Sequence, residues 1–168
     1  MGPAYDRKLA LLLKQHGNQF WGTTIHEARR AQITVRLLAA VLDQESGGAH
    51  NVWGHDPVKC GPRGGAVTRE NYAGYKRQRG HCGMQGCGPM QLTWYAFQDE
   101  ADRLGGCWDP RINIRVGAQT LGKLVRQHGL AAGIARYNGT GPAAQRYSRQ
   151  VLERVEVWTD RCRKAGLL

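Results

Sequence analysis

The chain has 168 residues, of which 41% are hydrophobic and 22% are charged, the size and composition of about one globular domain. These values exclude a disordered tail, a collagen-like rod and a small disulfide knot, and no apolar stretch approaches the roughly 20 residues of a membrane-spanning helix. With 24 basic and 13 acidic residues the net charge is +11, so the surface should attract polyanions such as nucleic acid, anionic lipid headgroups or an acidic cell wall.

The first residues do not read as a secretory signal peptide. Arg7 and Lys8 precede the apolar run Leu9–Leu13, which is shorter than the about 7–15 apolar residues of a signal's hydrophobic region. Instead, this segment predicts a helix over about 6–16 with Asp6 as its cap. We therefore expect a chain without a signal peptide.

A longer helix is predicted over about 25–45, where apolar residues recur at helical spacing. Glycines then break the periodicity over about 46–88, and we expect a long Gly-rich loop insertion there. A short helix at about 68–77 and a small hairpin are the regular elements that this insertion could contain.

Four further helices are predicted over about 93–104, 110–128, 130–136 and from 142 onward. Thr93 can cap the first of them, and Asp109 followed by Pro110 is a strong start for the second. Strand patterns are nearly absent. The sequence therefore predicts a mostly α fold in a single domain, 1–168.

Glu45 is the first candidate for chemistry. On a helix it lies on the same side as Leu38, Val41 and Leu42, which precede it by three to seven residues. Burial against such a face disfavours the charged carboxylate and raises its pKa, as a general acid requires. The alternative is a glutamate of the last turn that points into water. Asp43, two residues earlier, should point away from Glu45.

Four segments together suggest a family. They are Leu38–Gly47 with Glu45-Ser46-Gly47 at its end, Gly88-Pro-Met90-Gln91-Leu92-Thr93, Asp109-Pro110 with Asn113-Ile114 and Gly117, and Ala135-Arg136-Tyr137-Asn138-Gly139. Each is weak alone, but in this order, over about 33–147, they resemble the goose-type lysozyme and soluble lytic transglycosylase superfamily.

The resemblance implies a lysozyme-like α domain that cleaves peptidoglycan between N-acetylmuramic acid and N-acetylglucosamine. Glu45 would be the catalytic acid, and Ser46 would help to orient the acid or the sugar. The other implied substrate-binding residues are Met90 and Gln91 at the groove floor, together with Thr93, Tyr137 and Asn138. Tyr147 either corresponds to a further aromatic residue of the family or is a core tyrosine.

The number of catalytic carboxylates, one or two, decides which reaction is possible. An inverting hydrolase needs a base about 6.5–9.5 Å from the acid, whereas a lytic transglycosylase uses one glutamate and the sugar's own 6-hydroxyl. Goose-type hydrolases carry extra aspartates before the Met-Gln segment, where this chain has 81–87 without a carboxylate. Asp56 is the candidate second carboxylate, and its alternative role is a turn before Pro57. Hydrolysis and transglycosylation both stay open.

Five cysteines leave several states open. We favour unpaired thiols, with Cys162 buried on an apolar helical stripe. One or two disulfides are an alternative. A structural zinc site on Cys60, Cys82, Cys87 and His81 is another, although the spacing matches no strong zinc signature. No other cofactor is expected.

The resemblance, the charge and the missing signal suggest the catalytic module of a phage endolysin. Such a monomer would leave the host cytoplasm for the wall and act on glycan strands and acidic wall polymers, without nucleic acid. Five aromatic residues flank the proposed groove and could stack on sugars, although Trp94 and Tyr95 are rather expected in the core; the other three are Trp53, Tyr72 and Tyr75. A non-catalytic basic module that binds wall glycan or nucleic acid is the alternative of another class.

Overall fold

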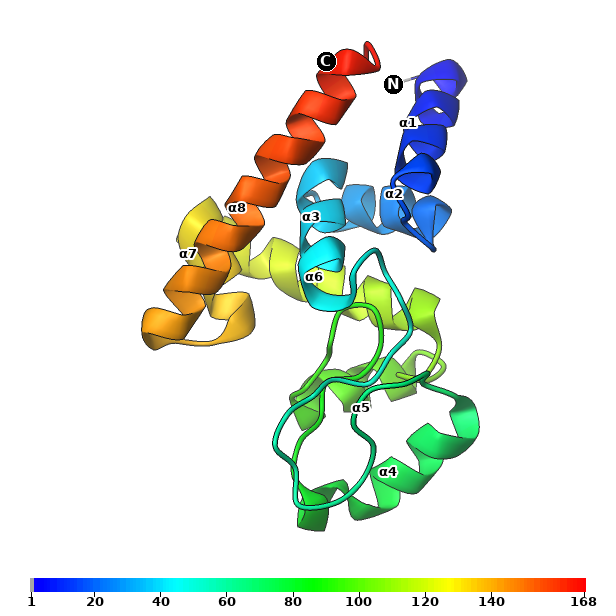
Figure 1. The fold of residues 1–168 in the computed structure, drawn as a ribbon, viewed down its shortest axis with the longest axis vertical. Helices are drawn as coiled ribbons and strands as arrows, with labels where there is room; N and C mark the ends of the chain where they lie inside the picture. Colours follow the sequence, from blue (N-terminus) through cyan, green and yellow to red (C-terminus); the bar gives the residue numbers. More distant parts are fainter. Residues whose placement is uncertain (1) are drawn as a thin grey trace.

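The structure is a computed structural model that describes residues 2–168, and this part of the chain is mostly helical (Figure 1). Its eight helices are α1 (Pro3–Gln15), α2 (Trp21–Arg30), α3 (Val35–Ser46), α4 (Arg69–Cys82), α5 (Tyr95–Arg103), α6 (Pro110–His128), α7 (Leu130–Asn138) and α8 (Gly141–Lys164). Within residues 2–168 there is no strand, and the loops carry two isolated antiparallel bridges, Val52–Ala66 and Trp53–Cys87. The expected mostly α fold is confirmed, while bridges stand where a small hairpin was suggested.

The single helix expected over 25–45 is wrong, because the chain breaks between α2 and α3. Gln32 has a φ of 57°, which is incompatible with a right-handed helix. Thr34 then caps α3 by accepting a hydrogen bond of 3.1 Å from the backbone N–H of Leu37. The helix ends as predicted at Gly47, which adopts left-handed backbone angles.

Of three other predicted helix caps, one is confirmed and two are wrong. Asp109 caps α6 by accepting from the backbone N–H of Arg111 at 2.8 Å. Asp6, by contrast, lies inside the first turn of α1, where Pro3 sets the helix start. Thr93 does not cap α5, whose N-cap is Trp94.

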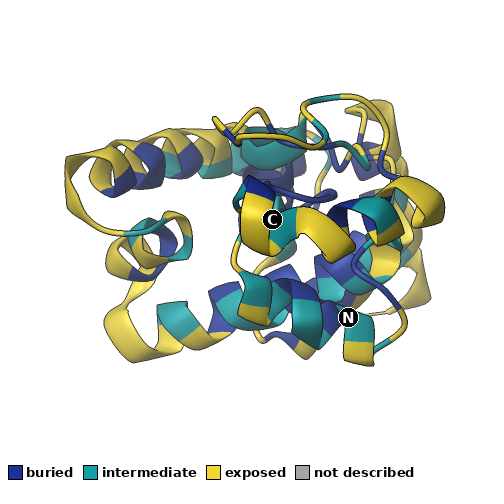
Figure 2. Ribbon diagram, turned by 90° about the horizontal axis from the view of Figure 1, so that it is seen from below, coloured by how far each residue is buried: buried dark blue, intermediate teal, exposed yellow. Residues whose placement is uncertain are grey.

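Helix α3 occupies the middle of the helical half of the molecule. It packs against α2 and α8, and α7 packs against both α6 and α8 (Figure 1). Six consecutive residues of α3, Leu37–Leu42, are buried, while most other helices bury one side and expose the other (Figure 2). Burial of α3 fixes the position of Glu45 in its last turn.

Helices α4 and α5 lie with the loops at the opposite end from the two termini (Figure 1). Their small core contains Trp53, Tyr72 and Tyr75, which are all buried. The Trp53 ring centroid lies 5.0 Å from that of Tyr75 and 6.2 Å from that of Tyr72. These three aromatic residues therefore stabilise the loop region, and the suggestion that they stack on sugars is wrong.

Candidate active site

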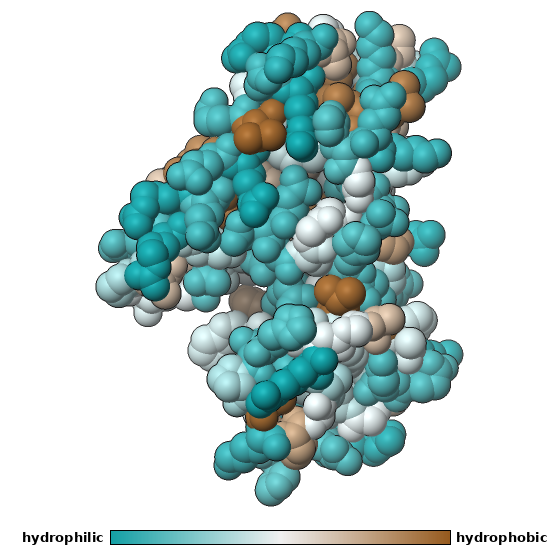
Figure 3. Space-filling model, viewed as in Figure 1, coloured by the Kyte–Doolittle hydropathy of each residue, from teal (hydrophilic) through white to brown (hydrophobic). Residues whose placement is uncertain are grey.

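A cleft of about 410 Å³ lies between the helical part and the loop part. In Figure 3 the surface is hollowed between the region of α7 and the region of α4 and α5. The cleft is lined by Glu45, Gly54, His55, Asp56, Gln91, Leu92, Thr93, Trp94, Phe97, Tyr137 and Asn138. Six of the predicted site residues, Glu45, Asp56, Gln91, Thr93, Tyr137 and Asn138, thus meet in one place.

Glu45 reaches the cleft from the last turn of α3 and is mostly buried. Burial raises its pKa from 4.5 to about 7, a hydrogen bond from Tyr147 opposes this rise, and the negative charge of Asp56 adds to it. The carboxyl group is therefore about half protonated at neutral pH. Asp43 points the other way, as predicted, and accepts a hydrogen bond of 2.8 Å from Trp158 Nε1.

Two tyrosines lie near Glu45. The hydroxyl of Tyr147, on α8, donates to Glu45 Oε1, so this residue is both buried and in contact with the candidate acid. The hydroxyl of Tyr137, at the end of α7, donates to the backbone carbonyl of Met90 at 2.8 Å. Burial, and then the charge of Glu45, raise the pKa of both phenols, which keeps them protonated as donors.

Hydrogen bonds connect the four segments that carry the family resemblance. Ser46 Oγ donates to the carbonyl of Pro89 at 2.8 Å, and the backbone N–H of Met90 donates to Asn113 Oδ1 at 2.9 Å. Together with the bond from Tyr137 to Met90, they join all four segments at residues 89–90. This network holds the ends of α3 and α7 in fixed positions beside the cleft.

Met90 does not act as the resemblance implied, and Ser46 lies outside the cleft. Met90 is fully buried and packs so closely on α6 that a Cβ at Gly117 would lie 2.5 Å from its own Cβ. Its side chain therefore cannot form the floor of a saccharide groove. Ser46 is absent from the cleft lining, and its bond to Pro89 holds the end of α3 that carries Glu45, which is consistent with orienting the acid and not with contacting a sugar.

Gln91 forms part of the cleft wall and also ties two loops together. Its Nε2 donates to the carbonyls of Val52 at 3.0 Å and Gly88 at 2.9 Å. A Cβ at Gly54 or at Gly86 would lie 2.7 or 2.5 Å from Gln91 Oε1. Glycine at these two positions therefore lets the loops close around the Gln91 amide.

Asp56 is exposed at the cleft and is held by the loop that follows α4. Its Oδ2 accepts from the backbone N–H of Gly86 at 3.1 Å. Its own N–H donates to Gln85 Oε1 at 3.1 Å, while Gln85 Nε2 donates to the carbonyl of Pro62 at 2.9 Å. Gln85 is fully buried. No local pattern in the sequence indicated that it would hold the Asp56 loop.

The prediction for Trp94 is also wrong. It was expected in the core but is 59% exposed at the cleft. It is the N-cap of α5, with extended backbone angles, and so precedes the first helical residue. His55, Leu92 and Phe97 also line the cleft, and sequence reasoning did not select them as lining residues.

Two of the five cysteines form a disulfide, and three are free. Cys60 and Cys82 form a disulfide that connects the loop after Asp56 to the end of α4, so the expectation of unpaired thiols is wrong for these two. The zinc alternative on Cys60, Cys82, Cys87 and His81 is also wrong, because the disulfide consumes two of its ligands. Cys87, Cys107 and Cys162 are free and buried, and residues 2–168 contain no group of three His, Cys, Asp or Glu side chains arranged to hold a metal.

Comparison with known proteins adds no relative. No family model, curated protein or solved structure was found to match this chain. No helix among residues 2–168 has the length and apolar character needed to cross a bilayer. The residues of the cleft are therefore the basis for inferring a function.

Proposed function

We propose that this protein is a muramidase that cleaves the β-1,4 bond between N-acetylmuramic acid and N-acetylglucosamine in peptidoglycan, with Glu45 as the general acid. One observation carries the proposal: a mostly buried glutamate, with its pKa raised to about 7, opens into a cleft lined by polar side chains. A carboxyl group in this state can donate a proton to a glycosidic oxygen at neutral pH.

The other cleft residues suit a glycan. Thr93 and Asn138 offer hydroxyl and amide groups for hydrogen bonds to acetamido sugars, and the exposed indole of Trp94 can pack on a pyranose face. The net charge of +11 favours encounter with acidic wall polymers, an effect that salt should weaken. These features support a wall glycan as substrate, with the protein acting as a monomeric endolysin module.

Asp56 favours hydrolysis over transglycosylation. It lines the same cleft as Glu45, close enough for its charge to act on Glu45, and Gly86 fixes its carboxylate. A carboxylate in this position can act as the base that activates water. In the alternative reaction, Glu45 would first donate a proton and then take one from the 6-hydroxyl of muramic acid, and Asp56 would be structural.

The test is digestion of purified peptidoglycan, followed by mass spectrometry of the released fragments. Wild-type protein should release fragments with reducing ends, whereas fragments lighter by one water would identify the transglycosylase alternative. Glu45→Gln should abolish release. Asp43→Asn is the matched control, because this carboxyl lies on the same helix but bonds to Trp158, and it should retain activity. Equal release by wild type and Glu45→Gln would refute Glu45 as the general acid, and no release by either protein would favour a non-catalytic glycan-binding module.

A further inference from the structure

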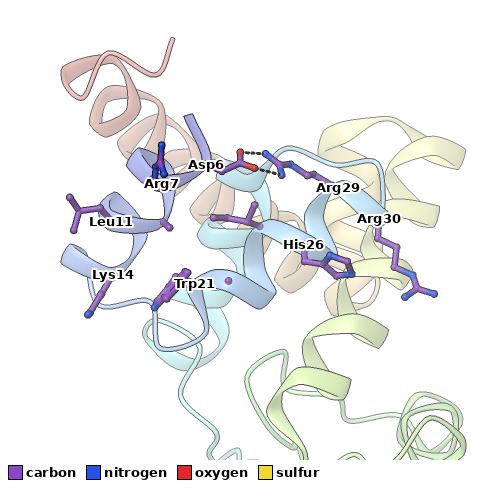
Figure 4. Close-up of a pocket in the computed structure, with 11 residues that line it drawn as sticks. Asp6, Arg7, Leu11, Lys14, Trp21, His26, Arg29 and Arg30 are labelled. Atoms are coloured by element: carbon purple, nitrogen blue, oxygen red, sulfur yellow. Dashed lines mark hydrogen bonds and ion pairs between the residues drawn. The ribbon is translucent and has the colours of Figure 1, made fainter. Parts of the chain in front are cut away.

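A second concave surface lies away from the cleft, between α1 and α2 (Figure 4). This α1–α2 groove has a volume of about 910 Å³, more than twice the 410 Å³ of the cleft. The two sites share no residue, and Figure 1 places α1 and α2 at the other end of the molecule from α4 and α5. The groove is lined by Asp6, Arg7, Ala10, Leu11, Lys14, Trp21, Gly22, Ile25, His26, Arg29 and Arg30.

The groove displays apolar side chains that the core does not use. Helix α1 buries Leu9, Leu12 and Leu13, so Leu11 lies outside its packed face and is 56% exposed. Trp21, the first residue of α2, is 41% exposed at the other side of the groove. Two large apolar side chains facing water beside one hollow indicate a docking surface.

Positive charge surrounds these apolar side chains. Arg7 and Lys14 flank the groove on α1, and Arg30 flanks it on α2 (Figure 4). All three are exposed, and none forms an ion pair with any carboxylate in the described part of the chain. The single acidic residue of the groove, Asp6, is already paired with Arg29, whose Nη1 lies 2.9 Å from Asp6 Oδ2.

We propose that the α1–α2 groove docks onto an anionic phospholipid bilayer. Trp21 and Leu11 would enter the boundary between headgroups and acyl chains, where tryptophan is favoured. Arg7, Lys14 and Arg30 would contact lipid phosphates. This inference concerns the location of the protein and does not depend on the reaction in the cleft.

The arrangement of the cations favours a membrane over an acidic helix of a protein partner. Figure 4 shows Arg7 and Lys14 along α1 and Arg30 across the groove on α2, with Trp21 between Lys14 and Arg30. A helix lying in a groove presents its acidic residues along its flanks. A bilayer presents phosphates over its whole surface, and therefore matches cations on both helices beside exposed apolar side chains.

The test is flotation with vesicles made of equal amounts of phosphatidylglycerol and phosphatidylcholine, at about 0.15 M salt. Wild-type protein should bind these vesicles and not vesicles of phosphatidylcholine alone. The triple variant R7A/K14A/R30A should bind about 100-fold more weakly, because each cation near an anionic surface contributes roughly a fivefold increase in affinity. The double variant L11S/W21S should bind at least about 10-fold more weakly, because it loses the apolar area that enters the bilayer.

Matched controls separate the groove from the overall charge. The variant R77A/K123A/R149A removes the same charge from exposed residues elsewhere, and Leu130→Ser removes an exposed leucine from α7; both should bind as wild type does. Circular dichroism melts should be unchanged, and if L11S/W21S melts lower, L11S alone provides the same comparison. Failure of wild type to bind, or equal weakening by the control triple variant, would overturn the proposal, and the first result would favour an acidic protein partner.

Discussion

Replacing Glu45 by glutamine should stabilise the protein while it removes activity. The folded protein holds the Glu45 pKa at about 7, against an ordinary value of 4.5. An acid with a raised pKa binds its proton more tightly in the folded state than in the unfolded state. The stability that this proton provides is therefore fully present below pH 4.5 and is lost as the pH rises through 7.

The magnitude follows from the size of the shift. The two pKa values differ by about 2.5, which at about 1.4 kcal/mol per pH unit is at most about 3.5 kcal/mol in total, and about 3 kcal/mol of this is lost between pH 4.5 and pH 8. Glutamine cannot ionise, yet its amide oxygen can still accept the hydrogen bond from Tyr147. The Glu45→Gln variant should thus avoid this loss and gain up to about 3 kcal/mol relative to wild type as the pH rises over this interval.

The assay is urea unfolding of both proteins at pH 4.5 and pH 8, with the difference between the two conditions as the result. This difference cancels any change in packing that does not depend on pH. Glu153→Gln, on the exposed side of α8, is the matched control and should change stability equally at both pH values. If Glu45→Gln behaves like this control, Glu45 is not held in a desolvated position, and its assignment as a general acid loses its physical basis.

Three further predictions concern Tyr147, Asp56 and the disulfide. Tyr147→Phe should raise the Glu45 pKa by roughly one unit, because the lost hydrogen bond stabilises the carboxylate. A carbon-13 NMR titration measures this pKa. Tyr137→Phe loses a bond to Met90 instead and should leave the Glu45 pKa almost unchanged. Asp56→Asn should reduce hydrolysis of peptidoglycan at least about 100-fold, and release at the wild-type rate would exclude Asp56 as the base. Replacing Cys60 and Cys82 by serine should lower the free energy of unfolding, measured with urea, by roughly 3 kcal/mol for a loop of this length. An unchanged free energy of unfolding would mean that loss of the disulfide gives the unfolded chain little additional conformational freedom.

Local signals in the sequence were sufficient where one residue determines the backbone. Asp109 before Pro110 predicted the start of α6, and Gly47 predicted the end of α3, because capping and left-handed backbone angles depend on neighbours in the chain. The side of α3 on which Glu45 lies also followed from spacing alone. Gln32 shows the limit, since a left-handed glutamine between two helices carries no sequence signal comparable to that of glycine.

Tertiary contacts determined what the sequence left open. Gln85 becomes part of the site because folding places its amide beside Asp56, 29 residues away in sequence. Trp94 is exposed because α5 begins one residue after it, which no periodicity indicates. Cys60 is paired with Cys82 because the loop returns to the end of α4.

The four segments that suggested a family do not contain Asp56, the residue on which the choice between hydrolysis and transglycosylation is proposed to depend. Ser46, Met90, Asn113 and Gly117 form the buried connection between α3, α6 and the Met-Gln segment, and they do not line the cleft. Such a connection can position a general acid for hydrolysis or for transglycosylation equally well. Asp56 lies outside all four segments, so resemblance to the superfamily cannot choose between the two reactions. The mass of the released sugar ends shows whether water or the 6-hydroxyl attacks, and Asp56→Asn then shows whether Asp56 activates that water.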